Sequence, residues 1–396
     1  SEKRVPELDG IRGLAIFLVL IWHFVGITVY GPGLPNAISR VTSLTWSGVD
    51  LFFVLSGFLI AGILIDNRGA LNYFRAFYIR RVCRIFPLYY AWLILILLGV
   101  LFVHVSTLDR FFNNFFPVAS YLTFTQNFFI AKWTDFRTPL LAMTWSLAVE
   151  EQFYLLLPLT IFLVPPRKLP AVLLTFIVAA PVLRTTLYFL YPNHYFAPHV
   201  LMPCRADSLL LGALLAYGVR KPDWFRRMQA WRFQIYALLA LLFAVIVLFV
   251  TFDVTQGRSL MNTIGLSVFA LFYTAILTII VTQKDGLFAK IARWPTLRFL
   301  GKLAYGLYIF NLGALTVSHR FFLDQEPEAN SWAGRAVTAF AIAVTFAAAM
   351  TSWHLLEQPI LKLGHRFKYR RATGAGAPSA APILHEIRPD PATANT

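Results

Sequence analysis

The stretch E-L-D-G-I-R-G-L-A-I-F-L-V-L-I-W-H-F, from Glu7 to Phe24, decides the class of fold. It is apolar over most of the length that crosses the hydrocarbon core of a membrane, which takes about 20 residues. It nevertheless contains Arg12 and His23. Placing a charged side chain inside a membrane costs about 3 kcal/mol of free energy or more, so such residues usually have a function. The stretch predicts a membrane-spanning helix with two ionisable residues to explain.

The composition of the whole chain extends this prediction. Of the 396 residues, 58% are hydrophobic and 14% are charged, whereas a soluble domain has about 25% charged residues. The apolar residues form long runs, so we expect an all-α polytopic membrane protein, a bundle of about ten transmembrane helices. The predicted spans are 11–30, 48–66, 87–104, 142–164, 170–190, 205–219, 234–252, 261–282, 303–322 and 336–356.

The distribution of basic residues predicts the orientation. With ten spans, most Lys and Arg residues fall in the loops on the side of the two termini, so both termini are expected in the cytoplasm. The segment 111–130 contains Asn113, Pro117 and Asn127 and is too polar for an easy span. We expect it to be interfacial or re-entrant and packed on protein. An eleventh span there would reverse the charge asymmetry of every later loop.

The chain is expected to form one transmembrane domain over residues 1–371. The segment 372–396 is rich in Ala, Pro, Gly and Thr and is predicted to be a disordered cytoplasmic tail. The net charge of +16 does not predict a nucleic-acid partner, because the basic residues lie between apolar runs, where membrane lipids are the expected contacts. Cys83 and Cys204 cannot form a disulfide framework, and no metal site is expected.

Arg12 and His23 are separated by 11 positions, which in an α-helix corresponds to about three turns plus 20° and a rise of about 16 Å. Both side chains are therefore expected on one face, Arg12 near the cytoplasmic end and His23 past the midplane. For this pair alone two interpretations stay open. One is a snorkelling arginine with a hydrogen-bonded packing histidine, and the other is a functional pair.

Other polar residues are expected in the outer half of the spans. Asp50 and Ser56 enter the second span in G-V-D-L-F-F-V-L-S, and spans four to six add further polar groups. Together these residues predict a polar cavity in the bundle. The further candidates are Trp145, Ser146, Glu150, Glu151, Gln152, Tyr154, Arg184, Arg205 and Asp207. For Arg205 with Asp207, a structural ion pair is the alternative hypothesis.

A basic cluster precedes the third predicted span in Y-I-R-R-V-C-R-I-F-P-L-Y-Y. Arg80 and Arg84 are an i, i+4 pair, so their guanidinium groups share a helix face, and with Arg81 they suit a polyphosphate. The alternative is ordinary positive-inside charge or contact with lipid phosphates.

Seven motifs together carry a resemblance to a known family. They occur in order between Val5 and about Leu363, and the chain resembles the integral-membrane acyltransferase family often called acyltransferase-3. The motifs are R-x10-H from Arg12 to His23, G-V-D-L-F-F-V-L-S-G-F-L-I, R-R-V-C-R-I-F-P-L-Y-Y, W-S-L-A-V-E-E-Q-F-Y-L-L-L-P, C-R-A-D-S-L-L-L-G-A-L-L-A, G-K-L-A-Y-G-L-Y-I-F-N and L-L-E-Q-P-I.

The resemblance implies a ten-span enzyme of the bacterial inner membrane. It would move an acyl group, in the first instance acetyl, from cytoplasmic acyl-CoA to a hydroxyl of a cell-envelope glycan, a lipid-linked sugar or a small molecule. Arg12 and His23 match the family's functional pair, and Glu150 and Glu151 match its acidic motif. The basic motif, matched by Arg80, Arg81 and Arg84 with Tyr89 close behind, would hold the CoA. The chain resembles family members without a fused esterase-like domain.

One position departs from the family. Asn311 closes Y-G-L-Y-I-F-N where the family commonly has a histidine, and an amide cannot take up a proton near neutral pH. We therefore expect His23 to act as the general base, with Asp50 or Glu150 orienting its imidazole. Arg12, Ser56, Asn311 or a tyrosine is expected to stabilise the oxyanion. Direct transfer and an acyl-histidine intermediate both stay open.

Two other classes of protein are the alternatives. A proton-coupled transporter or a flippase of a lipid-linked sugar would also contain buried charges, but no inverted repeat is found. A receptor or scaffold would leave the intramembrane charges unexplained.

Overall fold

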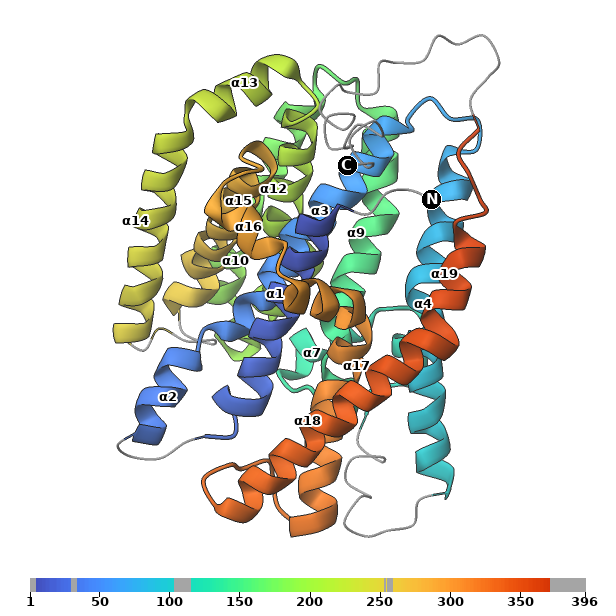
Figure 1. Cartoon of the computed structure of the whole chain (residues 1–396), viewed down its shortest axis with the longest axis vertical. Coiled ribbons are helices and arrows are strands. Elements are labelled where there is room, and N and C mark those ends of the chain that lie inside the picture. Colours follow the sequence, from blue (N-terminus) through green and yellow to red (C-terminus); the bar gives the residue numbers. More distant parts are fainter. Residues whose placement is uncertain (1–4, 30–33, 103–114, 253, 255–258, 371–396) are drawn as a thin grey trace, which may run out of the picture.

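The computed structural model of the chain describes residues 5–29, 34–102, 115–252, 254 and 259–370. Within these ranges every regular element is a helix (Figure 1). Ten helical stretches among the described residues are long and apolar enough to cross a membrane. The predicted all-α polytopic bundle with ten spans is therefore confirmed. The predicted tail at 372–396 lies outside the described residues.

Each span is centred on one long helix. These helices are α1 (Pro6–Ile21), α3 (Gly48–Asp66), α4 (Tyr73–Phe102), α9 (Thr144–Leu163), α10 (Leu169–Leu190), α12 (Met202–Gly218), α14 (Arg232–Thr251), α15 (Leu266–Thr282), α17 (Pro295–Leu323) and α18 (Trp332–Ser352). Three π-helices extend them: Trp22–Gly26 after α1, Met261–Gly265 before α15 and Trp353–Glu357 after α18. The last of these leads into α19 (Gln358–Gly364).

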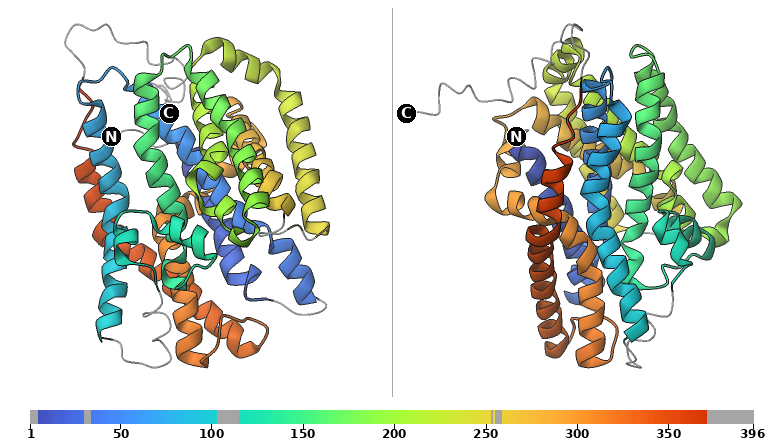
Figure 2. Two further views of the ribbon diagram at one scale, coloured as in Figure 1. Left: turned by 180° about the vertical axis from the view of Figure 1, so that it is seen from behind. Right: turned by 90° about the vertical axis from the view of Figure 1, so that its right-hand side faces the viewer.

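Short helices connect the spans at both ends of the bundle. α13 (Pro222–Ala230) lies at one end and α2 (Leu34–Thr42) at the other, and the views in Figure 2 show the long helices side by side between them. The start of α1 and the end of α19 both lie towards the end that carries α13 (Figure 1). The remaining short helices are α6 (Val118–Leu122), α7 (Gln126–Trp133), α8 (Pro139–Ala142), α11 (Ala197–Val200) and α16 (Leu287–Ala292).

The predicted non-spanning segment around 111–130 forms α6 and α7. Residues 103–114 lie outside the described part of the chain, and α7 packs on α9 and α11, as expected for a segment packed on protein. Its amides find partners inside the protein. Gln126 donates to the carbonyl of Thr144 at 2.9 Å, and Asn127 donates to the carbonyl of Val200 at 3.1 Å. The donors of these two amides are thus satisfied by neighbouring helices.

A very close helix contact beside the site joins α3 to α12. A Cβ atom on Gly57 would lie 1.8 Å from the carbonyl oxygen of Leu209, and one on Gly212 would lie 2.0 Å from that of Val54. Only glycine allows backbones to approach this closely, and small residues are the usual means of helix packing in membranes. The two helices therefore form a rigid pair.

This contact predicts the effect of adding one methyl group. Gly57→Ala forces α3 and α12 apart, and overpacking of this kind costs about 1–3 kcal/mol. We expect a midpoint of thermal unfolding in detergent several degrees below that of the wild type. Gly69→Ala is the matched control, because no atom lies within 4 Å of its added Cβ. Equal midpoints for the two variants would contradict the close approach.

Candidate active site

A cavity of about 330 Å³ lies between α3, α4, α9 and α17. Its size is at the lower end of the range for small-molecule sites. The structure brings eight of the predicted site residues together in its lining. They are Arg12, Ser56, Arg80, Arg81, Arg84, Ser146, Glu150 and Tyr154.

One face of α9 supplies the polar side of the cavity. Ser146, Glu150 and Tyr154 are spaced four residues apart, which places them on one stripe of the helix. The hydroxyl of Ser146 shares a hydrogen bond of 2.7 Å with Tyr308 of α17, and that of Tyr154 shares one of 2.5 Å with Ser56 of α3. A carboxyl group thus stands between two hydroxyl pairs that join three helices.

The three arginines of the basic motif belong to α4 itself. The prediction that span three begins at 87 is wrong, because α4 starts at Tyr73 and continues through Pro87. The guanidinium of Arg81 lies over the ring of Tyr154 at 5.3 Å from its centroid, a cation–π contact. Arg80, Arg81 and Arg84 therefore line the cavity from a rigid helix and not from a loop.

Arg12 and His23 do not meet in the cavity. Arg12 lines it and binds Asp9 at 2.8 Å, whereas His23 is buried in the π-helix after α1 and is not part of the lining. Val49 and Phe52 line the inner wall, and both also pack on the cluster that contains Phe24. The inner wall of the cavity therefore packs on the same hydrophobic cluster as Phe24, the residue that follows His23.

Four of the predicted cavity residues form two buried ion pairs instead. Arg205 binds Asp50 at 2.7 Å, and Arg184 binds Asp207 through two bonds of 2.8 and 2.9 Å. The predicted pair between Arg205 and Asp207 is wrong, since side chains two apart on a helix point in different directions. None of the four is in the cavity lining.

The Arg205–Asp50 pair lies directly behind the cavity. The guanidinium of Arg205 is 5.4 Å from the ring centroid of Phe53, which lines the cavity. Ser208 also donates to Asp50, at 3.2 Å, and Ser267 of α15 donates to Asp207 at 2.7 Å. Hydrogen bonds to remaining lone pairs are what make buried charge tolerable.

Several other predicted site residues have structural partners. Tyr89 donates to the carbonyl of Tyr121 at 2.8 Å, and Gln152 donates to that of Phe124 at 2.8 Å. Asn311 donates to the carbonyls of Leu307 and Tyr308, each at 2.8 Å, within its own helix. The side-chain amide group of Asn311 thus donates its hydrogen bonds within α17.

Trp145 and Glu151 also lie outside the lining. Trp145 packs against the ring of His199 at a centroid distance of 4.8 Å and edge-on to Phe53 at 6.3 Å. Glu151 has one buried carboxyl oxygen without a hydrogen bond. Trp145 therefore supports the wall of the cavity through Phe53 and does not form it.

Sequence reasoning missed four lining residues with polar side-chain groups. Tyr305 and Tyr308 come from Y-G-L-Y of α17, where their spacing of three residues was a usable signal. His365 and Tyr369 follow the last span, and nothing in their local sequence indicates the cavity. Among the described residues, no group of three or more His, Cys, Asp and Glu side chains is placed to hold a metal ion.

The sequence of the chain was compared with models of known protein families. Residues 5–354 match the family model of the acyltransferase domain of type 3. The chain belongs to the acyltransferase-3 family. This confirms the resemblance that the seven motifs indicated. No solved structure matches the chain.

The curated relatives of this acyltransferase-3 chain include named O-acetyltransferases. The peptidoglycan O-acetyltransferase OatA of Listeria monocytogenes is 27% identical over 92% of this chain, and the putative peptidoglycan O-acetyltransferase YrhL of Bacillus subtilis is 26% identical over 93%. A putative O-acetyltransferase of Staphylococcus aureus is 26% identical over 91%. The chain spans 57–58% of the length of these relatives.

The buried ion pairs predict a large difference between two arginine substitutions. Arg205→Met leaves Asp50 charged and unpaired in the bundle, which costs about 3–5 kcal/mol. Arg226→Met breaks the exposed pair with Asp223, which costs about 1 kcal/mol or less. We expect only the first variant to unfold many degrees earlier, and Asp50→Asn added to it to restore part of the loss. Equal unfolding midpoints for the two single variants would overturn the assignment.

Proposed function

We propose that the chain is a membrane-embedded O-acyltransferase that transfers an acyl group, in the first instance acetyl, from acyl-CoA to a hydroxyl group. The acceptor is a glycan, a lipid-linked sugar or a related molecule of the cell envelope. The observation that carries the proposal is one cavity with three arginines on α4 and a row of hydroxyl and carboxyl groups on α9. Family membership and relatives named as O-acetyltransferases support it.

The donor enters at the arginine side of the cavity. Guanidinium groups bind phosphate oxygens in a fixed, often bidentate geometry, and the i, i+4 spacing of Arg80 and Arg84 presents two of them together. The CoA phosphates bind there, and the pantetheine arm extends inward past Arg12. Acyl-CoA is made in the cytoplasm, so this side faces the cytoplasm of a bacterial inner membrane.

The thioester lies against the polar row of α9. When the acceptor oxygen attacks its carbonyl carbon, negative charge develops on the carbonyl oxygen, and hydroxyl donors or a guanidinium stabilise that charge. The Ser146 and Tyr308 pair and Arg12 are the groups in the lining that do so. Asn311 is not used for this role, because its donor is bound to its own helix.

In this proposal His23 is the general base, which requires the Val49 and Phe52 side chains to move aside so that the acceptor hydroxyl comes within hydrogen-bond reach of the imidazole. It removes the proton of the acceptor hydroxyl as the new C–O bond forms. The C–S bond then breaks to release the CoA thiolate, which takes up the proton that the His23 imidazolium holds, so that the histidine is neutral again. Asp50 and Glu150 were the two candidates for orienting the imidazole. Asp50 accepts hydrogen bonds from Arg205 and Ser208, whereas Glu150 lines the cavity and is the carboxyl group that remains for this role. Direct transfer requires no covalent enzyme intermediate.

Loss of the imidazole tests the chemical step. We expect purified protein with acetyl-CoA to release free thiol, and His23→Ala to lower that rate by a factor of about 100 or more, as removal of a general base does. His354→Ala is the matched control, because His354 is also the second residue of a π-helix that begins with Trp, yet it is exposed.

Two results would count against the proposal. Near-normal thiol release by a folded His23→Ala variant removes the histidine from the chemistry. No thiol release by the wild type with any acyl-CoA, together with movement of a solute or lipid across vesicle membranes, identifies a carrier instead.

Loss of one arginine tests the donor site. Arg84→Met removes a charge-assisted contact to phosphate, a contact worth about 1.5–3 kcal/mol, so we expect the KM for acetyl-CoA to rise about tenfold or more. Arg75→Met is the control, because Arg75 lies on the same helix but is exposed and outside the cavity. Equal effects of the two substitutions in steady-state kinetics would show that the basic cluster only provides general charge.

A further inference from the structure

The chain beyond α19 forms a short segment, residues 365–370, which we call the strap. Three hydrogen bonds hold it to the connection between α3 and α4. The amide of Leu71 donates to the carbonyl of Arg370 at 2.9 Å, and the amide of Arg370 donates to the side-chain oxygen of Asn72 at 2.8 Å. Asn72 also donates to the carbonyl of Lys368 at 3.0 Å. Asn72 thus binds the strap through both ends of its amide.

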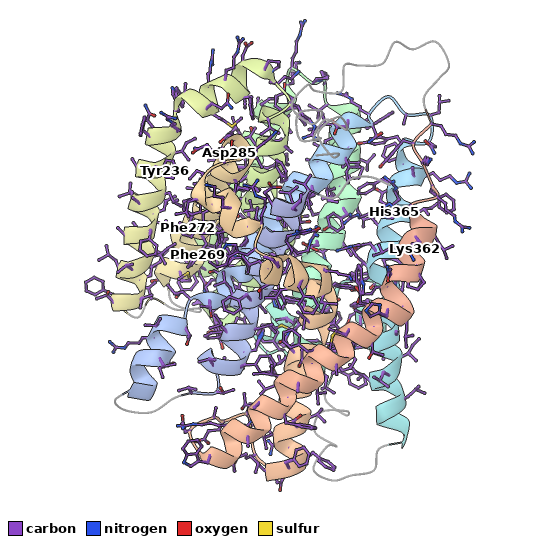
Figure 3. All side chains as sticks on the ribbon, in the orientation of Figure 1. Tyr236, Phe269, Phe272, Asp285, Lys362 and His365 are labelled. Atoms are coloured by element: carbon purple, nitrogen blue, oxygen red, sulfur yellow. The ribbon has the colours of Figure 1, made fainter. Side chains whose placement is uncertain are left out.

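α19 packs tightly against α4 and directs the strap to the arginines. A Cβ atom on Gly364 would lie 2.9 Å from the Cβ of Cys83, which follows Arg80 and Arg81 on α4. The views in Figure 2 show α19 beside α4, and Figure 3 places His365 at that edge of the bundle. The strap therefore lies next to the part of the cavity that is lined by the arginines of α4.

Two side chains of the strap line that cavity. His365 and Tyr369 join Arg80, Arg81 and Arg84 in its lining, and the guanidinium of Arg80 lies over the Tyr369 ring at 5.6 Å from the centroid. This part of the cavity offers flat rings next to guanidinium groups. Such a combination suits a ligand that contains both a flat heterocyclic base and phosphate groups, because bases stack on aromatic rings while phosphates pair with arginine.

We propose that the strap forms a subsite for the nucleotide end of the donor, in which Tyr369 and His365 contact the base beside the phosphates held by the arginines. The inference rests on the proposed use of acyl-CoA and extends it to residues after the last span. Asn72 is a positioning residue in this account, because it fixes the strap without lining the cavity.

The test compares two donors that share the acetylpantetheine arm. Only one of them, acetyl-CoA, also has the nucleotide end with its phosphate groups. Thiol release by the full-length protein is measured with acetyl-CoA and with S-acetylpantetheine, which has no nucleotide. Base stacking on an aromatic side chain is worth about 1–3 kcal/mol, so Tyr369→Ala is expected to raise the KM for acetyl-CoA about tenfold. The kcat/KM for S-acetylpantetheine is expected to change less than twofold, and Tyr369→Phe to retain most of the affinity for acetyl-CoA.

Asn72→Ala is expected to have the same effect as Tyr369→Ala. It should raise the KM for acetyl-CoA and leave the kcat/KM for S-acetylpantetheine nearly unchanged. Asn67→Ala is the matched control, since Asn67 lies in the same connection but donates to the carbonyl of Ile63 and does not touch the strap. Equal losses with both donors would show that the strap only supports the fold. An unchanged KM for acetyl-CoA in folded Tyr369→Ala would also overturn the subsite.

A binding measurement separates this inference from the proposed reaction. Adenosine 3′,5′-bisphosphate, titrated into the protein by calorimetry, requires no turnover. We expect binding to the wild type and about tenfold weaker binding to Tyr369→Ala. If the wild type does not bind it, the subsite is overturned. If it binds as expected but no donor releases thiol, the proposed acyl transfer fails and the nucleotide subsite stands.

Discussion

Charge buried among membrane-spanning helices must be neutralised within the bundle, and the rest of this structure depends on how that is done. Arg205 of α12 binds Asp50 of α3, and Arg184 of α10 binds Asp207 of α12 together with Ser267 of α15. The two ion pairs join three spans, α3, α10 and α12, and the hydrogen bond of Ser267 adds α15 as a fourth. Because each partner comes from a different helix, separating the helices would expose a charge to hydrocarbon. These pairs act as fixed links between spans.

The cavity is built on this fixed part. Phe53 separates it from Arg205, and the glycine contact between α3 and α12 keeps both helices in place. Opposite this wall, α9 presents Ser146, Glu150 and Tyr154, and α4 presents the arginines. A rigid framework lets polar groups keep their positions while a ligand is bound, which is the condition for electrostatic stabilisation of a transition state. The two ion pairs thus serve the site without entering it.

The sequence was sufficient for the parts that depend on local pattern. Apolar runs predicted the ten spans, and the polar content of 111–130 predicted a segment that packs on protein. The stripe of Ser146, Glu150 and Tyr154 follows from the period of one helix. The partners of Arg184 and Arg205 could not be predicted, because ion pairing between helices depends on their tertiary arrangement. Asp207, the near neighbour of Arg205 in the sequence, was weighed as its partner, whereas the partner is Asp50 on another helix.

Two further differences have equally physical causes. Arg12 and His23 were expected on one face of one helix, but only Arg12 lines the cavity. Val49 and Phe52, which line it as well, come from α3, and the periodicity of α1 carries no information about residues of another helix. The strap was missed because its role arises from hydrogen bonds to Leu71 and Asn72, nearly 300 residues earlier in the chain. Asn311 was weighed as a catalytic group, whereas the backbone of α17 accepts its hydrogen bonds.

The central claim is that acyl-CoA occupies this cavity with its phosphates at α4 and its thioester towards α9. The most direct measurement is an experimental structure of the full-length protein with coenzyme A bound. The account predicts phosphate oxygens within hydrogen-bond distance of at least two of Arg80, Arg81 and Arg84, and the sulfur deeper in the cavity beside Ser146 or Glu150. Coenzyme A bound at another surface, or with its sulfur directed away from α9, would contradict it.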